Sequence, residues 1–265
     1  MGITARGRAV LGAALTVVSL LSVPFSAQAT GAPPPASASA SLDWSTFTVT
    51  PFNLGYGIPI LTWTVQTESV SANTDGGISS TDSASDWTTD ITAESWGSHA
   101  LATAGAGGPT TLAEAGGPGM DGAYAGAEHP GEFAVSGLTT GFGLLVFAID
   151  YALDISLDTT GPEYDAWGST YAGINASLFG TPGTYASASD ALSTWPSIGD
   201  NTTFFGHRKG VLQFGLLVTP GATGSFQAYT SSDVTTLAAV PVPPAVWLMG
   251  GALIGLVGIA RRRGA

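Results

Sequence analysis

The sequence predicts an all-β protein, with a β-sandwich or jelly-roll domain over residues 42–238. In several stretches of this region polar and apolar side chains alternate with a period of two, which is the pattern of a half-buried strand. Gly- and Pro-rich turns separate these stretches, and no helical periodicity is sustained between them. Many strands without helices indicate a sandwich or a jelly roll.

The first two strands are expected over residues 42–50 and 60–67. In the first, threonines alternate with apolar residues. In the second, Leu61, Trp63 and Val65 share one face, and Thr62, Thr64 and Gln66 share the other. Both stretches are rich in β-branched and aromatic residues, which favour strands. A turn over residues 53–59 is expected to join them.

Residues 69–131 contain many Ser, Thr, Asp and Gly residues, and the part from 100 to 124 is almost only Ala, Gly and Pro. These residue types have low β propensity. We therefore expect long loops here, with short strands at 78–80 and 85–92. A short buried helix at 111–115 is an alternative to a loop.

The strongest strand signal runs over residues 143–157, after a short strand at 133–135. Every odd position of the longer stretch is apolar, whereas the even positions change from apolar to polar along it. A single strand of this length would span about 50 Å, so a break is expected near Asp150. A core strand over 211–218 and an alternating strand over 225–233 complete the domain.

The N-terminus has the three parts of a secretory signal peptide, residues 1–29. Arg6 and Arg8 form the basic part, an apolar stretch follows, and Ala27 and Ala29 frame the expected cleavage site. The expected partners are the Sec translocon and signal peptidase. Residues 30–41, TGAPPPASASAS, have the composition of a flexible linker.

The last segment, residues 239–265, combines a Pro-rich spacer, an apolar stretch and three arginines. About 20 residues in a helix span roughly 30 Å, which is the thickness of a bilayer core. One transmembrane helix is therefore expected at about 244–260. Arg261, Arg262 and Arg263 should stay in the cytoplasm under the positive-inside rule. The alternative, a buried core helix, fits poorly with three adjacent arginines.

These tail residues resemble the sorting signal of PEP-CTERM proteins. The resemblance is carried by Pro241, Val242 and Pro243, by the apolar helix, and by the arginine cluster. Val242 stands where the family usually has Glu, which resembles a VPVPxA-type variant. The resemblance implies that an exosortase, a membrane-embedded cysteine protease-transpeptidase, is the partner. The protein would be anchored in the inner membrane before processing and then reach the cell surface or the extracellular space.

Charge and cysteine content exclude several function classes. The formal net charge is −12, and between the terminal segments Arg208 and Lys209 are the only basic residues against all 19 acidic residues. Such a domain repels nucleic acid and anionic lipid. Because the chain has no Cys, disulfides, thiol nucleophiles and Cys zinc sites are excluded.

Aromatic residues in loop-like sequence are the best candidates for binding sugars, because Trp and Tyr present an apolar face for stacking. We expect carbohydrate contacts at Trp167, Tyr171 and Trp195. A calcium ion is an alternative ligand for two groups of loop acids, Asp82 with Asp86, and Asp158 with Glu163 and Asp165. Asp150, Asp154 and Asp158 repeat along one strand and are expected to form a solvated face rather than a metal site.

No catalytic residue is expected. His99, His129 and His207 lack metal-ligand spacing, and no nucleophile-elbow motif occurs. Glu132, Glu163 and Asp165 could serve a glycosidase only if two of them faced each other across a cleft. The expected function is that of a structural surface or matrix protein in exopolysaccharide or a biofilm. A secreted carbohydrate-binding module is the alternative, and an extracellular hydrolase is the weaker one.

Overall fold

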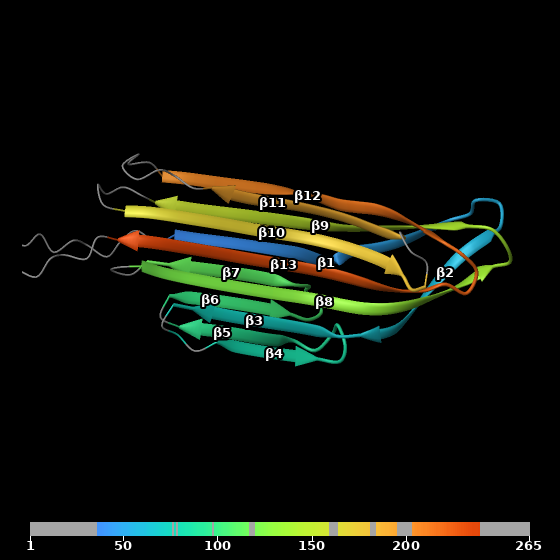
Figure 1. Ribbon diagram of the computed structural model, residues 1–265, viewed down its shortest axis with the longest axis horizontal. Coiled ribbons are helices and arrows are strands. Elements are labelled where there is room, and N and C mark those ends of the chain that lie inside the picture. Colours follow the sequence, from blue (N-terminus) through green and yellow to red (C-terminus); the bar gives the residue numbers. More distant parts are fainter. Residues whose placement is uncertain are drawn as a thin grey trace, which may run out of the picture. The chain divides into compact units, whose positions relative to one another are not determined.

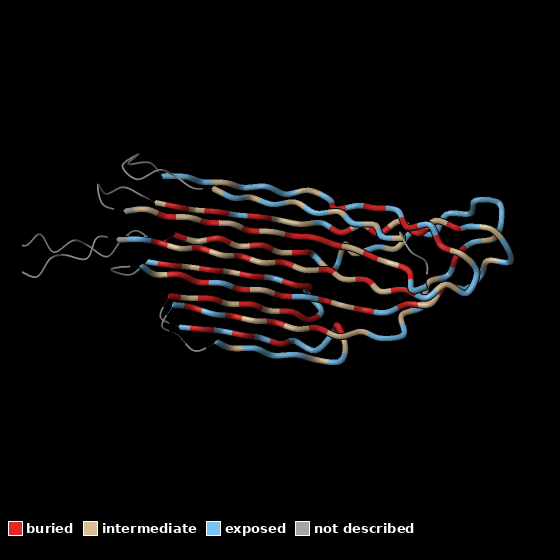
Figure 2. Tube along the Cα trace, viewed as in Figure 1, coloured by how far each residue is buried: buried red, intermediate tan, exposed pale blue. Residues whose placement is uncertain are grey.

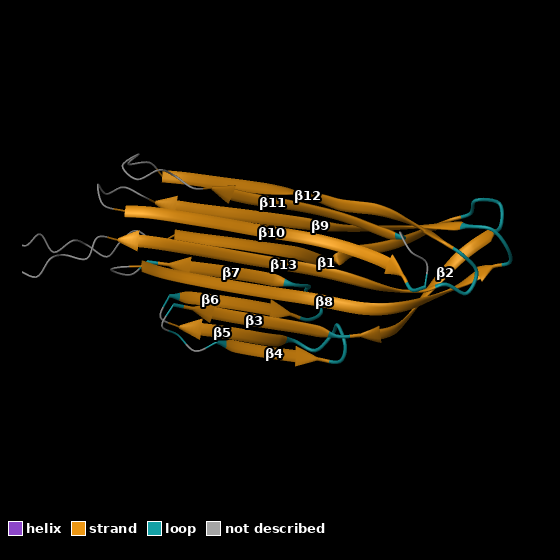
Figure 3. Cartoon of the chain, in the orientation of Figure 1, coloured by secondary structure: helices purple, strands orange, loops and turns teal. Residues whose placement is uncertain are grey.

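The computed structural model describes residues 36–238, apart from residues 76, 78, 97, 117–119, 159–163, 181–183 and 195–202. The expected signal peptide, most of the linker, the sorting tail and Trp195 lie outside the described residues. Strands joined by turns and short loops make up the described part, which contains no helix (Figure 3). Accordingly, none of its elements is a helix long and apolar enough to cross a membrane.

The strands form two antiparallel sheets, which confirms the all-β prediction (Figure 1). Sheet A has the order β12 (Thr203–Val218), β9 (Gly143–Asp158), β1 (Ala36–Phe52), β7 (Thr110–Ala115), β6 (His99–Ala104) and β5 (Ile91–Trp96). Sheet B has the order β11 (Tyr185–Thr194), β10 (Tyr164–Leu178), β13 (Thr223–Ala238), β8 (Met120–Leu138), β3 (Glu68–Thr74) and β4 (Ser80–Ala84). A further strand, β2 (Gly57–Gln66), pairs with the C-terminal part of β8.

The strongly alternating stretches form strands as predicted. The expected strands at 42–50, 60–67, 143–157, 211–218 and 225–233 fall in β1, β2, β9, β12 and β13. Buried and exposed residues alternate along most strands, so that each sheet has one face in the core and one toward solvent (Figure 2). This alternation is what the period-two side-chain geometry of a strand requires.

Two hydrophobic clusters fill the space between the sheets. The first is aromatic and aliphatic, and its largest fully buried side chains include Phe133, Phe147 and Phe226. The second is built mostly from alanine, with contributions from β1, β3, β5, β6, β7 and β8. Because close packing in a core tolerates few voids, a layer of alanine methyl groups requires the two sheets to approach closely there.

The alanine cluster explains why the linker and loop predictions were wrong. Residues 36–41 belong to β1 and not to a linker, so the sheets begin at Ala36 rather than at residue 42. Ala36, Ala38 and Ala40 are buried while the serines between them are half-buried. Similarly, the Ala-rich part from 100 to 124 forms β6, β7 and the start of β8. Composition suggested disorder, but alternating Ala and Ser fit a strand whose inner face packs closely.

Two local predictions in the same region were also wrong. Residues 111–115 form a strand within β7 rather than a helix. Of the predicted strand at 85–92, only Ile91 and Thr92 belong to a strand, β5, because Asp86 bends the chain before it. The carboxylate of Asp86 accepts hydrogen bonds from the backbone N–H of Thr88 and Thr89 at 2.8 and 2.7 Å, which is the geometry of a side-chain-stabilised turn.

The expected break near Asp150 occurs in the neighbouring strand instead. β9 runs without interruption for 16 residues. In β1 the register shifts between Asp43, opposite Asp150, and Thr48, opposite Ala148. The hydroxyl of Thr46 accepts the N–H of Asp150 at 2.9 Å, so the extra residues of β1 still satisfy the backbone of β9. This bulge turns Trp44 and Phe47 onto the core, where their rings stack at 4.5 Å.

Candidate functional site: a tyrosine-lined groove on sheet B

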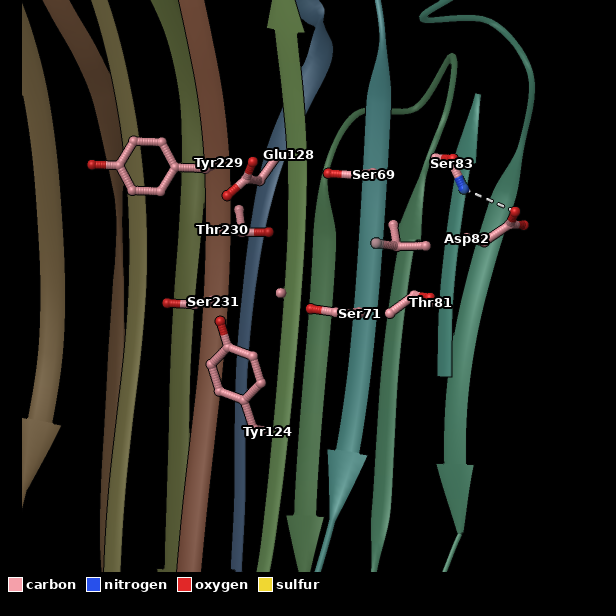
Figure 4. A pocket seen from close by; sticks show the side chains of 12 residues that line it. Ser69, Ser71, Thr81, Asp82, Ser83, Tyr124, Glu128, Tyr229, Thr230 and Ser231 are labelled. Carbon is pink, nitrogen blue, oxygen red and sulfur yellow. Dashed lines mark hydrogen bonds between the residues drawn. The ribbon is translucent and has the colours of Figure 1, made fainter. Parts of the chain in front are cut away.

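An open groove of about 580 Å³ crosses the solvent-facing side of sheet B, over strands β13, β8, β3 and β4 (Figure 4). We call it the outer-face groove. Strand register brings its parts together, because Glu128 of β8 lies between Tyr229 of β13 and Ser69 of β3. Three strand spacings give it a length of about 15 Å. Its hydroxyl-bearing aliphatic side chains at the surface are Ser69, Ser71, Thr81, Ser83 and Ser231.

Glycines next to the tyrosines allow the rings to lie against the sheet. A Cβ atom on Gly173 would lie 2.8 Å from the ring of Tyr229 and 2.9 Å from the ring of Tyr171. A Cβ on Gly126 would lie 2.9 Å from the hydroxyl of Tyr124. The rings of Tyr171 and Tyr229 stack with centroids 5.3 Å apart, and their hydroxyls lie 3.0 Å apart. Rings held over glycine in this way cover exposed backbone and offer an apolar surface to a ligand.

The groove carries negative charge and no positive charge. Glu128 and Asp82 line it, whereas Arg208 and Lys209, the only Lys and Arg side chains among the described residues, lie on β12 of sheet A. Burial, together with the charges of Glu128 and Asp233, raises the pKa of Tyr124. Burial and the hydrogen bond with Tyr171 raise the pKa of Tyr229. Both phenols therefore remain protonated and can donate hydrogen bonds at neutral pH.

Two of the three predicted sugar-contact residues, Trp167 and Tyr171, share this face, but they lie in a strand and not in the expected loops. Trp167 and Tyr171 are half-buried residues of β10, and Tyr171 reaches the groove through its stack on Tyr229. Trp167 lies one strand away from the groove, opposite Thr235 of β13. Alternation along residues 165–177 was the overlooked signal for a strand, because odd residues face outward and even residues are buried.

Tyr124 and Tyr229 were not predicted as site residues. The sequence signal for Tyr124 is the segment Tyr-Ala-Gly at residues 124–126, which occurs again at 171–173. Residues two apart share one strand face, so each tyrosine can lie over its own glycine. Tyr229 has no such segment, and only the register between β10 and β13 places it opposite Gly173.

Of the acidic residues considered for calcium, those that the structure describes are not grouped to hold a metal ion. The described residues contain no group of three or more His, Asp or Glu side chains placed to hold a metal ion. Asp82 accepts the N–H of Ser83, and the carboxylate of Asp86 is occupied by the turn described above. Asp150 and Asp154 are exposed on the outer face of β9, as expected for a solvated sheet face. Glu163 lies outside the described residues.

Of the carboxylates considered for glycoside hydrolysis, the two that the structure describes, Glu132 and Asp165, are far apart. Glu132 pairs with Ser225 near the start of β13, whereas Asp165 pairs with Leu237 near its end. Twelve residues of strand correspond to about 40 Å, and a glycosidase needs its two carboxyl groups within about 10 Å. Glu132 and Asp165 therefore cannot act on the same glycosidic bond.

A buried acid–imidazole pair lies between the sheets, and sequence reasoning missed it. Oε2 of Glu68 lies 2.9 Å from Nε2 of His129, and both side chains are fully buried. The N–H of Gly105 donates to the same Nε2 at 3.3 Å, so this nitrogen is an acceptor and the imidazole is neutral. The lone pair of Nε2 thus accepts from Gly105, and both carboxyl oxygens of Glu68 are without a hydrogen-bond partner among the described residues. Burial, with smaller effects from Asp86, Asp90 and Asp82, raises the pKa of Glu68 to about 7, and burial lowers the pKa of His129 to about 4.

Comparisons with known proteins give no assignment for this site. No family model, no curated protein and no solved structure matches the chain. What the outer-face groove can bind must follow from its own side chains.

Proposed function

We propose that this chain is an exported surface or extracellular-matrix protein whose sandwich domain binds polysaccharide in the outer-face groove. The observation that carries the proposal is the combination of flat tyrosine rings with serine and threonine hydroxyls in a groove that has no basic side chain. Sugar rings have an apolar face bordered by hydroxyl groups. The tyrosine rings of the groove can stack on that face, and its serine and threonine side chains can form hydrogen bonds with the sugar hydroxyls.

The charge of the groove selects the class of polysaccharide. Glu128 and Asp82 accept hydrogen bonds from sugar hydroxyls but repel uronate, sulfate and phosphate groups. The phenols of Tyr124 and Tyr229 donate hydrogen bonds. The ligand is therefore a glycan without acidic groups, lying across the strands from β13 toward β4.

The export part of the proposal comes from the ends of the chain. The signal peptide delivers the domain to the Sec translocon, and the tail around Pro241–Pro243 and Arg261–Arg263 retains it in the inner membrane until an exosortase acts. Release or re-anchoring at the surface would place a polysaccharide-binding domain within exopolysaccharide. Sorting by the tail would bring the domain to the matrix, and polysaccharide binding by the groove would hold it there as a structural component.

Substituting the central tyrosine tests the groove. Tyr229→Ala should weaken binding of a neutral β-linked glucan hexamer about ten-fold, or ~1.4 kcal/mol, because stacking area and a hydroxyl donor are lost. Tyr229→Phe should keep most of the affinity, since the ring remains. Isothermal titration of the exported protein measures both.

The matched control is Tyr56→Ala, which removes an exposed tyrosine from the loop between β1 and β2. It should leave glucan affinity unchanged. If Tyr229→Ala and Tyr56→Ala bind as tightly as the unaltered protein, the groove is not the binding site. An acidic hexamer of uronate residues should bind more weakly than the neutral one to all three proteins.

Mass spectrometry of the intact exported protein tests the sorting proposal. A processed chain should begin at Thr30 and should lack the C-terminal Arg-Arg-Arg-Gly-Ala. A mature chain that keeps those last five residues contradicts processing by an exosortase, whatever the glucan titrations give.

A further inference from the structure

An exposed tryptophan lies on the opposite side of the sandwich from the outer-face groove. Trp96 is the last residue of β5 in sheet A, and 67% of its surface is exposed. Its indole stacks on the imidazole of His99, with ring centroids 4.7 Å apart and planes inclined by 19°. His99 is half-buried on the outer face of β6. One face of the indole is therefore supported, and the other is open to solvent.

Two carboxylates hold the supporting imidazole in place. Nδ1 of His99 lies 2.9 Å from Glu114 on β7, and Nε2 lies 3.1 Å from Glu94 on β5. Each ring nitrogen must donate to its carboxylate, so His99 is an imidazolium. The hydrogen bond to Glu114 is the main cause that raises the pKa of His99. An imidazole ring held by two hydrogen bonds fixes the orientation of the indole stacked on it.

We infer that Glu94, Trp96, His99 and Glu114, which we call the Trp96 platform, form a second sugar-binding site, so that one molecule can bridge two polysaccharide chains. The open indole face would stack on the apolar side of a pyranose ring. The side chains of Glu94 and Glu114 are 38% and 44% exposed. They border the indole and accept hydrogen bonds from sugar hydroxyls. The bridging part rests on the proposed function, because it needs the outer-face groove to bind the other chain.

The charge of the platform indicates the class of ligand. Two carboxylates against one imidazolium leave a net negative charge, and both described basic residues lie on β12, at the far edge of sheet A from β5. A polymer of acidic sugars is therefore repelled. A neutral glycan, or one with free amino groups, is the expected ligand, which is the class that the groove also selects.

A protein partner fits this surface less well. Along residues 67–119, Trp96 is the only large apolar side chain that the described residues expose, and Leu101 and Leu112 beside the platform are half-buried. Stable protein interfaces cover about 800 Å² on each partner and have an apolar centre. A single indole bordered by carboxylates is too small a centre for such an interface, but it matches the size of one sugar ring.

Counting binding sites tests the inference directly. Isothermal titration of the exported protein with the neutral β-linked glucan hexamer should give two sites per molecule. Trp96→Ala should give one site, whereas Tyr229→Ala should keep two sites, with about ten-fold weaker binding at one of them. Trp96→Phe should keep two sites with weaker binding at one of them. Light scattering with a long soluble β-glucan should rise with the unaltered protein, rise less with Tyr229→Ala and stay low with Trp96→Ala, because bridging requires both sites.

The control is Phe142→Ala, which removes an exposed apolar side chain from the loop before β9 and should leave two sites. Two sites in Trp96→Ala, or one site in the unaltered protein that Tyr229→Ala weakens, would overturn the inference. Loss of a site in Trp96→Ala together with unchanged affinity at both sites in Tyr229→Ala would support the platform and contradict the groove. If Trp96→Ala instead abolishes self-association in sedimentation and leaves glucan binding intact, Trp96 is a protein contact and the inference fails.

Discussion

Replacing Trp87 by alanine should lower the free energy of unfolding by about 3–5 kcal/mol, as for other buried aromatic residues. Trp87 is 4% exposed although it lies in the bend between β4 and β5. Its ring contacts Trp44, Trp63 and Phe226, and its Nε1–H donates to the carbonyl oxygens of residues 67 and 130, both at 2.9 Å. The side chain thus ties this bend to the core and to the neighbouring strands.

Urea unfolding followed by far-UV circular dichroism measures the loss. Trp167→Ala serves as the matched control, because Trp167 is half-buried on the outer face of β10 and should cost clearly less. The loss of stability in Trp87→Phe should lie between those of the two alanine variants, since phenylalanine keeps part of the packing but loses both hydrogen bonds. Equal losses for Trp87→Ala and Trp167→Ala would show that Trp87 does not hold the bend to the core.

Removing either member of the buried pair should give opposite pH dependences of stability. In Glu68→Gln, His129 remains with a folded pKa of about 4, below its usual 6.5. Between pH 6.5 and 4 the histidine is protonated in the unfolded chain but not in the folded chain. The free energy of unfolding therefore falls by about 2–3 kcal/mol as the pH drops through this range. In His129→Phe, Glu68 remains with a folded pKa of about 7, above its usual 4.5. The stability that comes from the raised pKa of Glu68 is fully present below pH 4.5 and is lost as the pH rises through 7.

Urea unfolding at a series of pH values gives the stability of each protein as a function of pH. The difference between a variant and the unaltered protein cancels every group that the two share, so the Glu68→Gln difference reports the titration of Glu68 and the His129→Phe difference reports that of His129. In the unaltered protein the two slopes oppose each other between pH 4.5 and 6.5. A Glu68→Gln variant that becomes more stable on acidification relative to the unaltered protein would contradict a neutral pair and would indicate a carboxylate with an imidazolium.

The fold was predictable where side-chain size matched the strand pattern. Along β9 every odd residue is large and apolar, so alternation showed both the strand and its core face. Along β6 and β7 the inward residues are mostly alanine, whose low β propensity hid the same alternation. Ser37 and Ser39 of β1 were assigned to a linker for this reason, because composition received more weight than period.

The candidate site was only partly predictable, because it depends on register. Tyr171 was selected as an aromatic residue, and the structure places it on the same sheet face as the groove. Tyr124 and Tyr229 lie about a hundred residues apart in the sequence, and only the pairing of β8 with β13 brings them together. The buried pair depends likewise on pairing: Glu68 and His129 face the core from neighbouring strands, β3 and β8. Strand order and register come from packing of the whole domain, which no local pattern contains.

The most direct test of polysaccharide binding is an NMR titration of the exported protein with the neutral β-linked glucan hexamer, followed at the tyrosine ring resonances. Our account predicts that the rings of Tyr124, Tyr171 and Tyr229 shift together with one saturation curve, while the ring of Tyr56 stays unchanged. Tyrosine rings of the groove that stay unchanged at saturating hexamer would contradict it.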